Sequence, residues 1–422
     1  MKVAIVGAGI VGATTALVLA ERGLEVTLID AEAEAGLGTS YANGSSITPI
    51  HAEPWNPPGT IRKLPGALFN PRSPVRISLR ALPGLFHWGR RFIRESDSAR
   101  YQANARHSIR LALYAKRCLV ELRKRYDFSY DQWADGSMEL YRSRDALDGI
   151  IEFRRQLDLP GIEFQTLDRD EIVAREPTLE PVAVDFHGGL WMQAHESGDA
   201  RRFSAEAARV VQGLGADVRF GTPVDAIELS AGSIPTLRIG TDRLQVDRIV
   251  LCTGTATNRL LEPLGLKVPI YPIRGYSLTV PLPPKASAPQ VPLLDAERRF
   301  VVARLGPERL RIAGFADFCG PRRGLPKARL NLLRDSAEAL LPGLAKDLRC
   351  EAVEPWCGLR PMTPDGPPLI GPTPIDGLWL NTGHGAMGWT QAAGSAALLA
   401  DLLTGQTPAI EPDGLDARRA FR

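Results

Sequence analysis

The stretch that decides the fold of this 422-residue sequence is Val3-Ala4-Ile5-Val6-Gly7-Ala8-Gly9-Ile10-Val11-Gly12. Its four apolar residues predict a buried strand, and its three glycines predict a tight turn. The apolar spacing over residues 13–22 predicts a helix that stops at Gly23, and residues 26–29 predict a second strand that ends at Asp30. The first 30 residues therefore form one strand–helix–strand unit.

The glycine spacing of this unit is typical of dinucleotide binding. Gly7 makes the tight turn, Gly9 lets the backbone approach a pyrophosphate, and Gly12 lets the helix pack closely on the strand. Asp30 can accept hydrogen bonds from a ribose diol. We therefore assign a dinucleotide site to Gly7, Gly9, Ile10, Val11, Gly12 and Asp30. The unit alone leaves FAD and NAD open, and a purely structural glycine turn is the alternative.

Two distal turns bear on the choice of cofactor. Thr253-Gly254 follows a predicted strand, and Gly383-His384-Gly385-Ala386-Met387-Gly388-Trp389-Thr390 runs into a helix predicted from about residue 389 to 403. Such a loop presents free N–H groups and the positive end of a helix. A flavin needs this at its N1–C2=O edge, where reduction places negative charge, whereas a nicotinamide does not. The pattern favours FAD, and a simple strand–helix turn is the alternative.

The middle of the chain mixes helical and strand patterns. Residues 36–60 read as a long loop, and helices are predicted at 98–125 and 144–157. Strands are predicted at 185–193, 217–220, 226–229 and 248–251, and alternating runs at 276–280, 300–303 and 310–313 predict an antiparallel sheet. The fold class is α/β, a Rossmann-like FAD-binding domain with an inserted antiparallel-sheet substrate domain of α+β type. The expected boundaries are 1–90, 190–265 and 350–422 for the FAD-binding domain, and 91–189 and 266–349 for the substrate domain.

Composition excludes several classes of protein. Lysine and arginine number 51 against 48 aspartate and glutamate, and this net charge of +3 excludes a strongly basic nucleic-acid binder. The five cysteines form no CxxC pair, so we expect a reducing compartment and no metal site. The pattern of a folded domain begins at Met1, and no run reaches about 18 apolar residues. We therefore expect a cytoplasmic protein without a signal peptide or a membrane span.

Three blocks near the C-terminal end are Gly358-Leu359-Arg360-Pro361-Met362-Thr363-Pro364-Asp365-Gly366, Leu380-Asn381-Thr382-Gly383-His384-Gly385 and Gly388-Trp389-Thr390. They resemble the bacterial FAD-dependent D-amino acid dehydrogenases. These enzymes belong to one flavoprotein superfamily with glycine oxidase and D-amino acid oxidase. The resemblance extends to residues 39–44, Pro54-Trp55 and residues 271–279, and so covers nearly the whole chain.

The resemblance implies a role for individual residues. Arg360 should hold the substrate carboxylate, which suits the bidentate geometry of a guanidinium. Tyr276 should contact the carboxylate or the pocket, with an aromatic core residue as the alternative. His384 should act near the flavin through its backbone and position and not as a base. Ser40, Asn43, Gly44 and Ser45 should line the flavin, and the backbone of Val224 should lie on the adenine side.

The activity implied is FAD-dependent oxidation of D-amino acids to 2-oxo acids and ammonia, by hydride transfer from Cα to flavin N5. The alternatives are a 4-hydroxy-D-proline or other imino-acid dehydrogenase, a glycine- or sarcosine-type oxidase, and a flavin-binding subunit without turnover. His51 and Glu53 depart from the relatives, and a tyrosine that some relatives carry is missing near Arg298-Arg299-Phe300. His51 and Glu53 predict a polar, cationic or hydroxylated substrate side chain, unless both point to solvent.

Residues 54–94 contain no acidic residue. A basic and apolar segment is typical of attachment to an anionic membrane surface, and a solvated basic face is the alternative. The resemblance implies electron transfer to the respiratory chain, so we expect a quinone acceptor and peripheral contact with the inner face of the bacterial membrane. The basic residues are Arg62, Lys63, Arg72, Arg76, Arg80, Arg90, Arg91 and Arg94.

Overall fold

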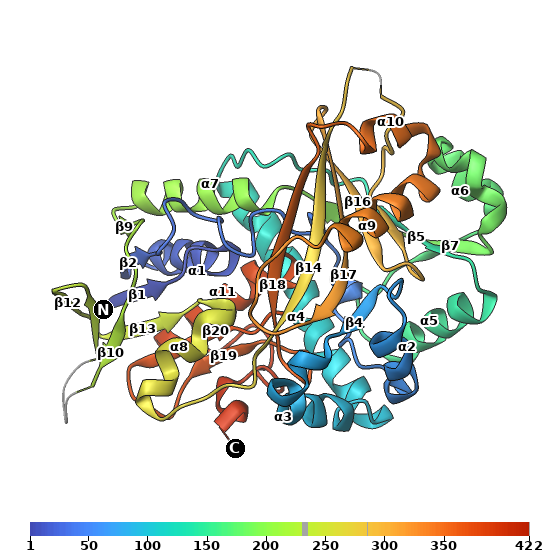
Figure 1. Cartoon of the computed structure of the whole chain (residues 1–422). Helices are drawn as coiled ribbons and strands as arrows, with labels where there is room; N and C mark the ends of the chain where they lie inside the picture. Colours follow the sequence, from blue (N-terminus) through green and yellow to red (C-terminus); the bar gives the residue numbers. More distant parts are fainter. Residues whose placement is uncertain (230–234, 285, 422) are drawn as a thin grey trace.

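The computed structural model describes residues 1–229, 235–284 and 286–421. Two large sheets dominate it, and the chain passes between them more than once (Figure 1). The first sheet lies beside both α1 and α11, so it combines the N-terminal and C-terminal parts of the chain. The long strands of the second sheet stand at the centre of the view.

The first sheet has six strands in the order β19-β20-β13-β1-β2-β9. All neighbours are parallel except the edge strand β19, which runs antiparallel to β20. Residues of β1, such as Val3 opposite Arg248, therefore pair with a strand about 245 positions later in the sequence. In sheet order the bounds are β19 Leu369–Pro372, β20 Leu378–Thr382, β13 Arg248–Leu251, β1 Lys2–Val6, β2 Glu25–Ile29 and β9 Asp217–Arg219.

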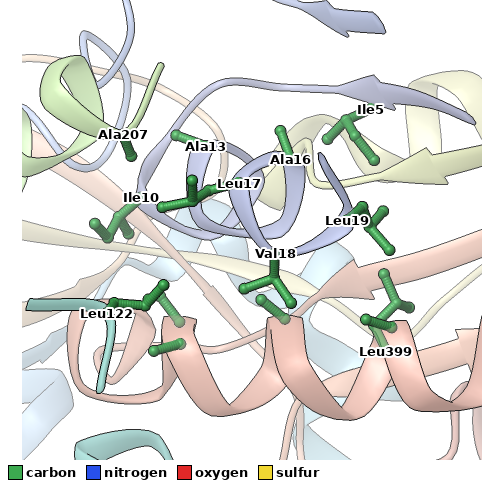
Figure 2. Packing of buried hydrophobic residues seen from close by; sticks show 14 of the residues in the cluster. Ile5, Ile10, Ala13, Ala16, Leu17, Val18, Leu19, Leu122, Ala207 and Leu399 are labelled. Atoms are coloured by element: carbon green, nitrogen blue, oxygen red, sulfur yellow. The ribbon is translucent and has the colours of Figure 1, made fainter. Parts of the chain in front are cut away.

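One face of this sheet is covered by helices that share an apolar core. Helix α1 (Ile10–Glu21) packs on α11 (Gly388–Thr404) and α7 (Ala200–Gly213), and α11 packs on α4 (Ser98–Arg125). Figure 2 shows Val18 and Leu19 of α1 directed toward Leu399 of α11. Alanines such as Ala207 keep these helices close, so the core is built from small and aliphatic side chains.

The second sheet has nine strands and is mostly antiparallel. Its order is β18-β14-β17-β16-β15-β5-β7-β6, with β4 paired to β17. Helix α9 (Lys327–Leu340) covers one face of its long strands. The bounds are β18 Glu354–Met362, β14 Tyr271–Pro281, β17 Arg309–Phe318, β16 Phe300–Leu305, β15 Leu293–Asp295, β5 Ser137–Tyr141, β7 Gly188–Met192, β6 Gln165–Leu167 and β4 Val75–Ile77.

The remaining elements are short or peripheral. Two small sheets contain β10 Ala226–Glu228, β11 Thr236–Ile239 and β12 Asp242–Gln245, and β3 Ser46–Ile47 with β8 Glu196–Ser197. The other helices are α2 Leu64–Phe69, α3 Leu82–Arg94, α5 Arg144–Gln156, α6 Arg169–Arg175, α8 Thr257–Leu261 and α10 Ala345–Leu348. In the described parts of the chain, no helix has the length and apolar character needed to cross a membrane.

The structure confirms the predicted fold class. The first unit folds as β1, α1 and β2, although α1 begins at Ile10, three residues earlier than the apolar spacing predicted. The helices predicted at 98–125 and 144–157 are α4 and α5, and the three alternating runs lie in β14, β16 and β17. Helix α4, in a segment expected to belong to the substrate domain, packs on α11 beside the first sheet.

Candidate active site

A cavity of about 720 Å³ is lined by residues of both large sheets. It brings together every residue singled out from the sequence except Gly12, which packs behind the turn. The cofactor residues that line it are Gly7, Gly9, Ile10, Val11, Asp30, Ser40, Asn43, Gly44, Ser45, Val224, Thr253, Gly254, Gly383, His384, Gly385, Gly388, Trp389 and Thr390, and the reaction-site residues are His51, Tyr276 and Arg360.

The N-terminal turn depends on glycine for steric reasons. Gly7 has a φ of +102°, and a Cβ there would lie 2.8 Å from the carbonyl oxygen of Cys252. A Cβ on Gly12 would overlap the carbonyl oxygen of Gly7. Both glycines therefore let the backbones of β1, α1 and β13 approach one another, as the glycine spacing predicted.

Polar side chains already hold the backbone of this turn. The hydroxyl of Ser40 accepts a hydrogen bond from the N–H of Ile10 at 3.0 Å, beside the first turn of α1. One carboxylate oxygen of Asp30 accepts from the N–H of Ala8, and the other accepts from Glu32 at 2.8 Å. The turn, Ser40 and Asp30 thus form one rigid, polar end of the cavity.

The C-terminal glycine loop also lines the cavity. Gly383 and Gly385 have positive φ values of 82° and 55°, and a Cβ on Gly385 would overlap the sulfur of Met362. Helix α11 starts directly after the loop, and no side chain caps its N-terminus. Its first N–H groups at Gly388 and Trp389 therefore remain free, with the positive end of the helix toward the cavity.

Three buried polar atoms on the cavity wall lack a hydrogen-bond partner among the described residues. They are Oγ of Ser45, Oδ1 of Asn381 and Nε2 of His384. Buried polar atoms are rarely left unsatisfied, so these atoms call for a polar ligand. Burial also lowers the pKa of His384 to about 3, which keeps the imidazole neutral.

Arg360 of β18 is the central cation of the cavity. Its guanidinium lies over Gly275 of β14, where any Cβ would overlap it, and under the ring of Trp55 at 5.3 Å. One guanidinium N–H donates to the carbonyl oxygen of Phe315 at 2.9 Å. Within the described chain, no carboxylate lies within ion-pairing distance of it, and burial lowers its pKa only to about 10. Arg360 is therefore a fixed and uncompensated positive charge.

Tyr276 lines the cavity but its hydroxyl is already engaged. The hydroxyl donates to Oδ2 of Asp317 at 2.7 Å, and burial raises the pKa of Tyr276 well above its ordinary value. The other oxygen of Asp317 pairs with the buried Arg329 at 2.8 Å. Arg329 thus neutralises Asp317, and this pairing keeps the charge of Arg360 available for a ligand.

His51 and Glu53 belong to a buried network and do not point to solvent. Nε2 of His51 contacts the carboxylate of Glu139, and Glu53 lies 3.3 Å from the guanidinium of Arg154. Arg154 also pairs with Glu139 at 3.0 Å. Burial lowers the pKa of His51 well below its ordinary value and raises the pKa of Glu53. His51, Glu53 and Arg154 of this network line the cavity.

The sequence reasoning missed several residues of this site. Glu139 and Arg154 were not singled out, nor was the role of Gly275 beneath Arg360. Glu139 carried one usable signal, because it is the charged residue in an otherwise apolar strand, Met138-Glu139-Leu140. Arg154 carried none, since helix α5 contains several charged residues and only the packing shows which one is buried.

Comparisons with known proteins agree with this geometry. A family model described as FAD dependent oxidoreductase matches residues 2–402. The D-amino acid dehydrogenase of Paramagnetospirillum magneticum is 38% identical over 420 residues, which is 99% of each chain. The glycine oxidase structure from Geobacillus kaustophilus has a TM-score of 0.73 at 22% identity and 99% coverage of both chains. The L-proline dehydrogenase structure from P. horikoshii has a TM-score of 0.76 at 16% identity, with coverage of 99% and 97%.

Proposed function

The chain belongs to the family of FAD-dependent oxidoreductases, and from this premise we propose that it oxidises D-amino acids to 2-oxo acids and ammonia. The uncompensated charge of Arg360 carries the proposal. A guanidinium that is fixed by Gly275, Trp55 and Phe315 offers a carboxylate two parallel hydrogen bonds. The D configuration is supported by the relative from P. magneticum.

The residues present fit FAD. The turn at residues 7–12 would hold the pyrophosphate, Asp30 would hold the ribose, and Val224 would lie on the adenine side. The unpartnered Ser45 Oγ and His384 Nε2 would satisfy the polar edge of the flavin. Because Gly383 and Gly385 cannot carry a side chain without overlap or strain, the loop leaves room for a flat ring system.

When bound, FAD supplies the acceptor for the hydride that leaves Cα of the substrate. Arg360 holds the carboxylate and so fixes the direction of the Cα–H bond, which is the main task of the protein in this reaction. The neutral His51 and His384 do not compete for the carboxylate. The amine proton passes to water, and the released imino acid hydrolyses in solution. The first turn of α11 adds positive potential to the cavity wall.

Anaerobic reduction of the bound flavin by paired D- and L-amino acids tests this function. We expect D-amino acids to bleach the flavin band and L-amino acids to leave it unchanged. Replacement Arg360→Leu should lower kcat/KM by about 100- to 1,000-fold with flavin content retained, because a charge-assisted contact is lost. Arg304→Leu, which changes a half-buried arginine of β16 outside the cavity lining, serves as the control. Undiminished turnover in Arg360→Leu, or bleaching by L-amino acids alone, would refute the assignment.

As a second part of this proposal, residues 54–94 bind an anionic membrane surface, where a quinone takes up the electrons. Five large apolar side chains of this segment are exposed, with Phe69 at 76% and Leu79 at 63%. The others are Ile61, Leu82 and Phe86. Its arginines are largely exposed too, and each contributes about 1 kcal/mol near anionic headgroups. Pro57, Pro74 and Val75 of the same segment line the cavity, which connects this face to the site.

Sedimentation with vesicles tests the membrane contact. We expect binding to anionic vesicles at low salt, release at high salt, and no binding to neutral vesicles. Replacing Phe69 and Phe86 by serine should abolish binding, whereas Val184→Ser, which changes an equally exposed apolar residue elsewhere, should not. Equal binding by the two variants would contradict the assignment of this face.

A further inference from the structure

Arg299 occupies an unusual backbone position at the cavity. It lies in the turn between β15 and β16, and its φ of +56° is in the left-handed region that glycine and asparagine favour. The turn is fixed by Asp295, whose carbonyl oxygen accepts from the N–H of Arg299 at 2.8 Å. Strained residues of this kind persist where the surrounding structure holds them, and they cluster at functional sites.

The side chain of Arg299 lines the cavity without a partner. Of the arginines on the cavity wall, Arg154 pairs with two carboxylates, whereas Arg299 and Arg323 have no side-chain hydrogen bond or ion pair within the described residues. Arg299 is an exposed residue, and it lines a cavity that is open to solvent. Burial lowers its pKa from the ordinary value, and the neighbouring Tyr101 is the one titratable group that opposes this shift.

Arg299 is joined to Arg360 through a single residue. The guanidinium of Arg360 donates to the carbonyl oxygen of Phe315, and the N–H of Phe315 donates to the carbonyl oxygen of Arg299 at 3.3 Å. Phe315 also has a positive φ, of 64°. Phe315 therefore holds the guanidinium of Arg360 and the backbone of Arg299, and both arginines line the same cavity.

We propose that Arg299 binds a second carboxylate of the substrate, so that the preferred substrates are acidic D-amino acids. This inference rests on the proposed function, in which Arg360 binds the α-carboxylate. The two arginines then act on the two ends of one dicarboxylic molecule. An unpaired guanidinium binds an anionic partner through charge-assisted hydrogen bonds.

The charges of the neighbouring network do not oppose this assignment. Glu53 also lines the cavity, but its carboxylate already faces Arg154 at 3.3 Å. Glu139 is engaged by Arg154, Tyr141 and His51. Arg154 balances one of these two carboxylates, and burial raises the pKa of Glu53, which favours its neutral form. A cationic side chain, one of the options predicted from the sequence, is therefore the less favourable partner. Arg299 then selects the substrate side chain by its negative charge.

Matched substrates of equal shape test the proposal in the FAD-loaded enzyme. D-Glutamate should reduce the flavin with at least about tenfold higher efficiency than D-glutamine, which lacks the second charge. Arg299→Met should lower the efficiency with D-glutamate by about 30- to 100-fold and change that with D-glutamine and D-alanine less than about threefold. A purely structural role of Arg299 would instead affect all three substrates equally.

Binding of unreactive acids gives a readout that does not depend on turnover. Glutarate has two carboxylates and butyrate has one, and neither carries an amine to oxidise. By calorimetry, glutarate should bind more tightly than butyrate, and Arg299→Met should remove this difference. Arg323→Met, which changes another cavity arginine, and Arg298→Met, in the same turn, should both retain it.

The outcomes separate the inference from the proposed function. Reduction by D-alanine and D-glutamine without an advantage for D-glutamate would overturn the role of Arg299 alone. Loss of the glutarate preference in Arg323→Met but not in Arg299→Met would also overturn it. If none of the three D-amino acids reduced the flavin, the proposed function would fail and the inference with it.

Discussion

The two walls of the cavity are built by different means. At the glycine turn and the C-terminal loop, backbone groups form the surface, and the core behind them contains alanines and aliphatic residues. At the second sheet, buried charge pairs support the wall, among them Arg154 with Glu139 and Arg329 with Asp317, and of these four residues Arg154 lines the cavity. The first wall depends on glycines that lack a side chain, and the second wall depends on which charges are paired.

This difference predicts how each wall tolerates change. A backbone site fails when an added atom prevents close approach, whatever the chemistry of that atom. A site of paired charges fails when one partner is removed and the other stays buried and uncompensated. The four experiments below separate these two kinds of failure.

The largest effect is expected at Gly12. In Gly12→Ala the new Cβ overlaps the carbonyl oxygen of Gly7, so α1 must move away from β1 and the pyrophosphate site should be lost. We expect a colourless protein without turnover, measured by flavin content after purification with excess FAD. Gly149→Ala, in open space within α5, should bind flavin normally and gain up to about 1 kcal/mol of stability. A yellow and active Gly12→Ala protein would show that this wall is not limited by backbone approach.

Removal of a single charge tests the opposite wall. Arg154→Met leaves Glu139 and Glu53 buried without their cation and should destabilise the protein by about 3–5 kcal/mol, measured by urea unfolding. The flavin should still bind, because the glycine turn is untouched. Arg155→Met removes an exposed charge from the next position and should change the unfolding free energy by less than about 0.5 kcal/mol. Equal effects of the two replacements would contradict the role of pairing.

Gly275 places a backbone constraint inside the charged wall. A Cβ in Gly275→Ala would displace the guanidinium of Arg360, and displacement of a substrate-holding group by about 1 Å can cost about 100-fold in rate. We expect this loss in kcat/KM with flavin content unchanged. Gly343→Ala, whose nearest contact would be 3.7 Å from Ser287, should keep full activity. Full activity in Gly275→Ala as well would show that Arg360 can adjust.

The smallest effect concerns protonation. Burial lowers the pKa of His195 well below 6.5, so the folded protein stays unprotonated there while the unfolded chain takes up a proton below that pH. The contribution of the neutral His195 to the free energy of unfolding is present above pH 6.5. It is lost as the pH falls, by about 1.4 kcal/mol per pH unit. Urea midpoints between pH 6.5 and 5 measure this slope, and His195→Asn should reduce it by that amount. Between pH 7.5 and 8.5 the unchanged protein and the His195→Asn variant should show the same dependence of the urea midpoint on pH.

The contrast between the walls also explains what the sequence could predict. The strand–turn–helix unit at residues 1–30 was predicted from spacing alone, because its constraints lie between near neighbours such as Gly7 and Gly12. The C-terminal loop was predicted for the same reason. Arg360 was predicted only through its family resemblance, since one arginine among many carries no local mark of being uncompensated.

The charged network could not be predicted because pairing is a long-range property. Glu139 on β5 contacts Arg154 on α5 and His51 of the 3-10 helix Pro49–His51, and no spacing in the sequence predicts these contacts. From the sequence, Glu53 was predicted to favour a cationic substrate side chain, among other options. In the structure, the cation beside Glu53 is Arg154 of the protein itself. Whether a charged side chain needs a partner depends on its burial, and its burial is set by how the two sheets pack.

The position of β1 has a consequence for biosynthesis. Its neighbour β13 begins at Arg248, so a nascent chain at about 5–20 residues per second spends roughly 12–50 s with one edge of its first strand uncovered. Helix α11, which closes the same layer, emerges later still. The first sheet and the helix layer on it therefore cannot be completed before residues 388–404 have been synthesised.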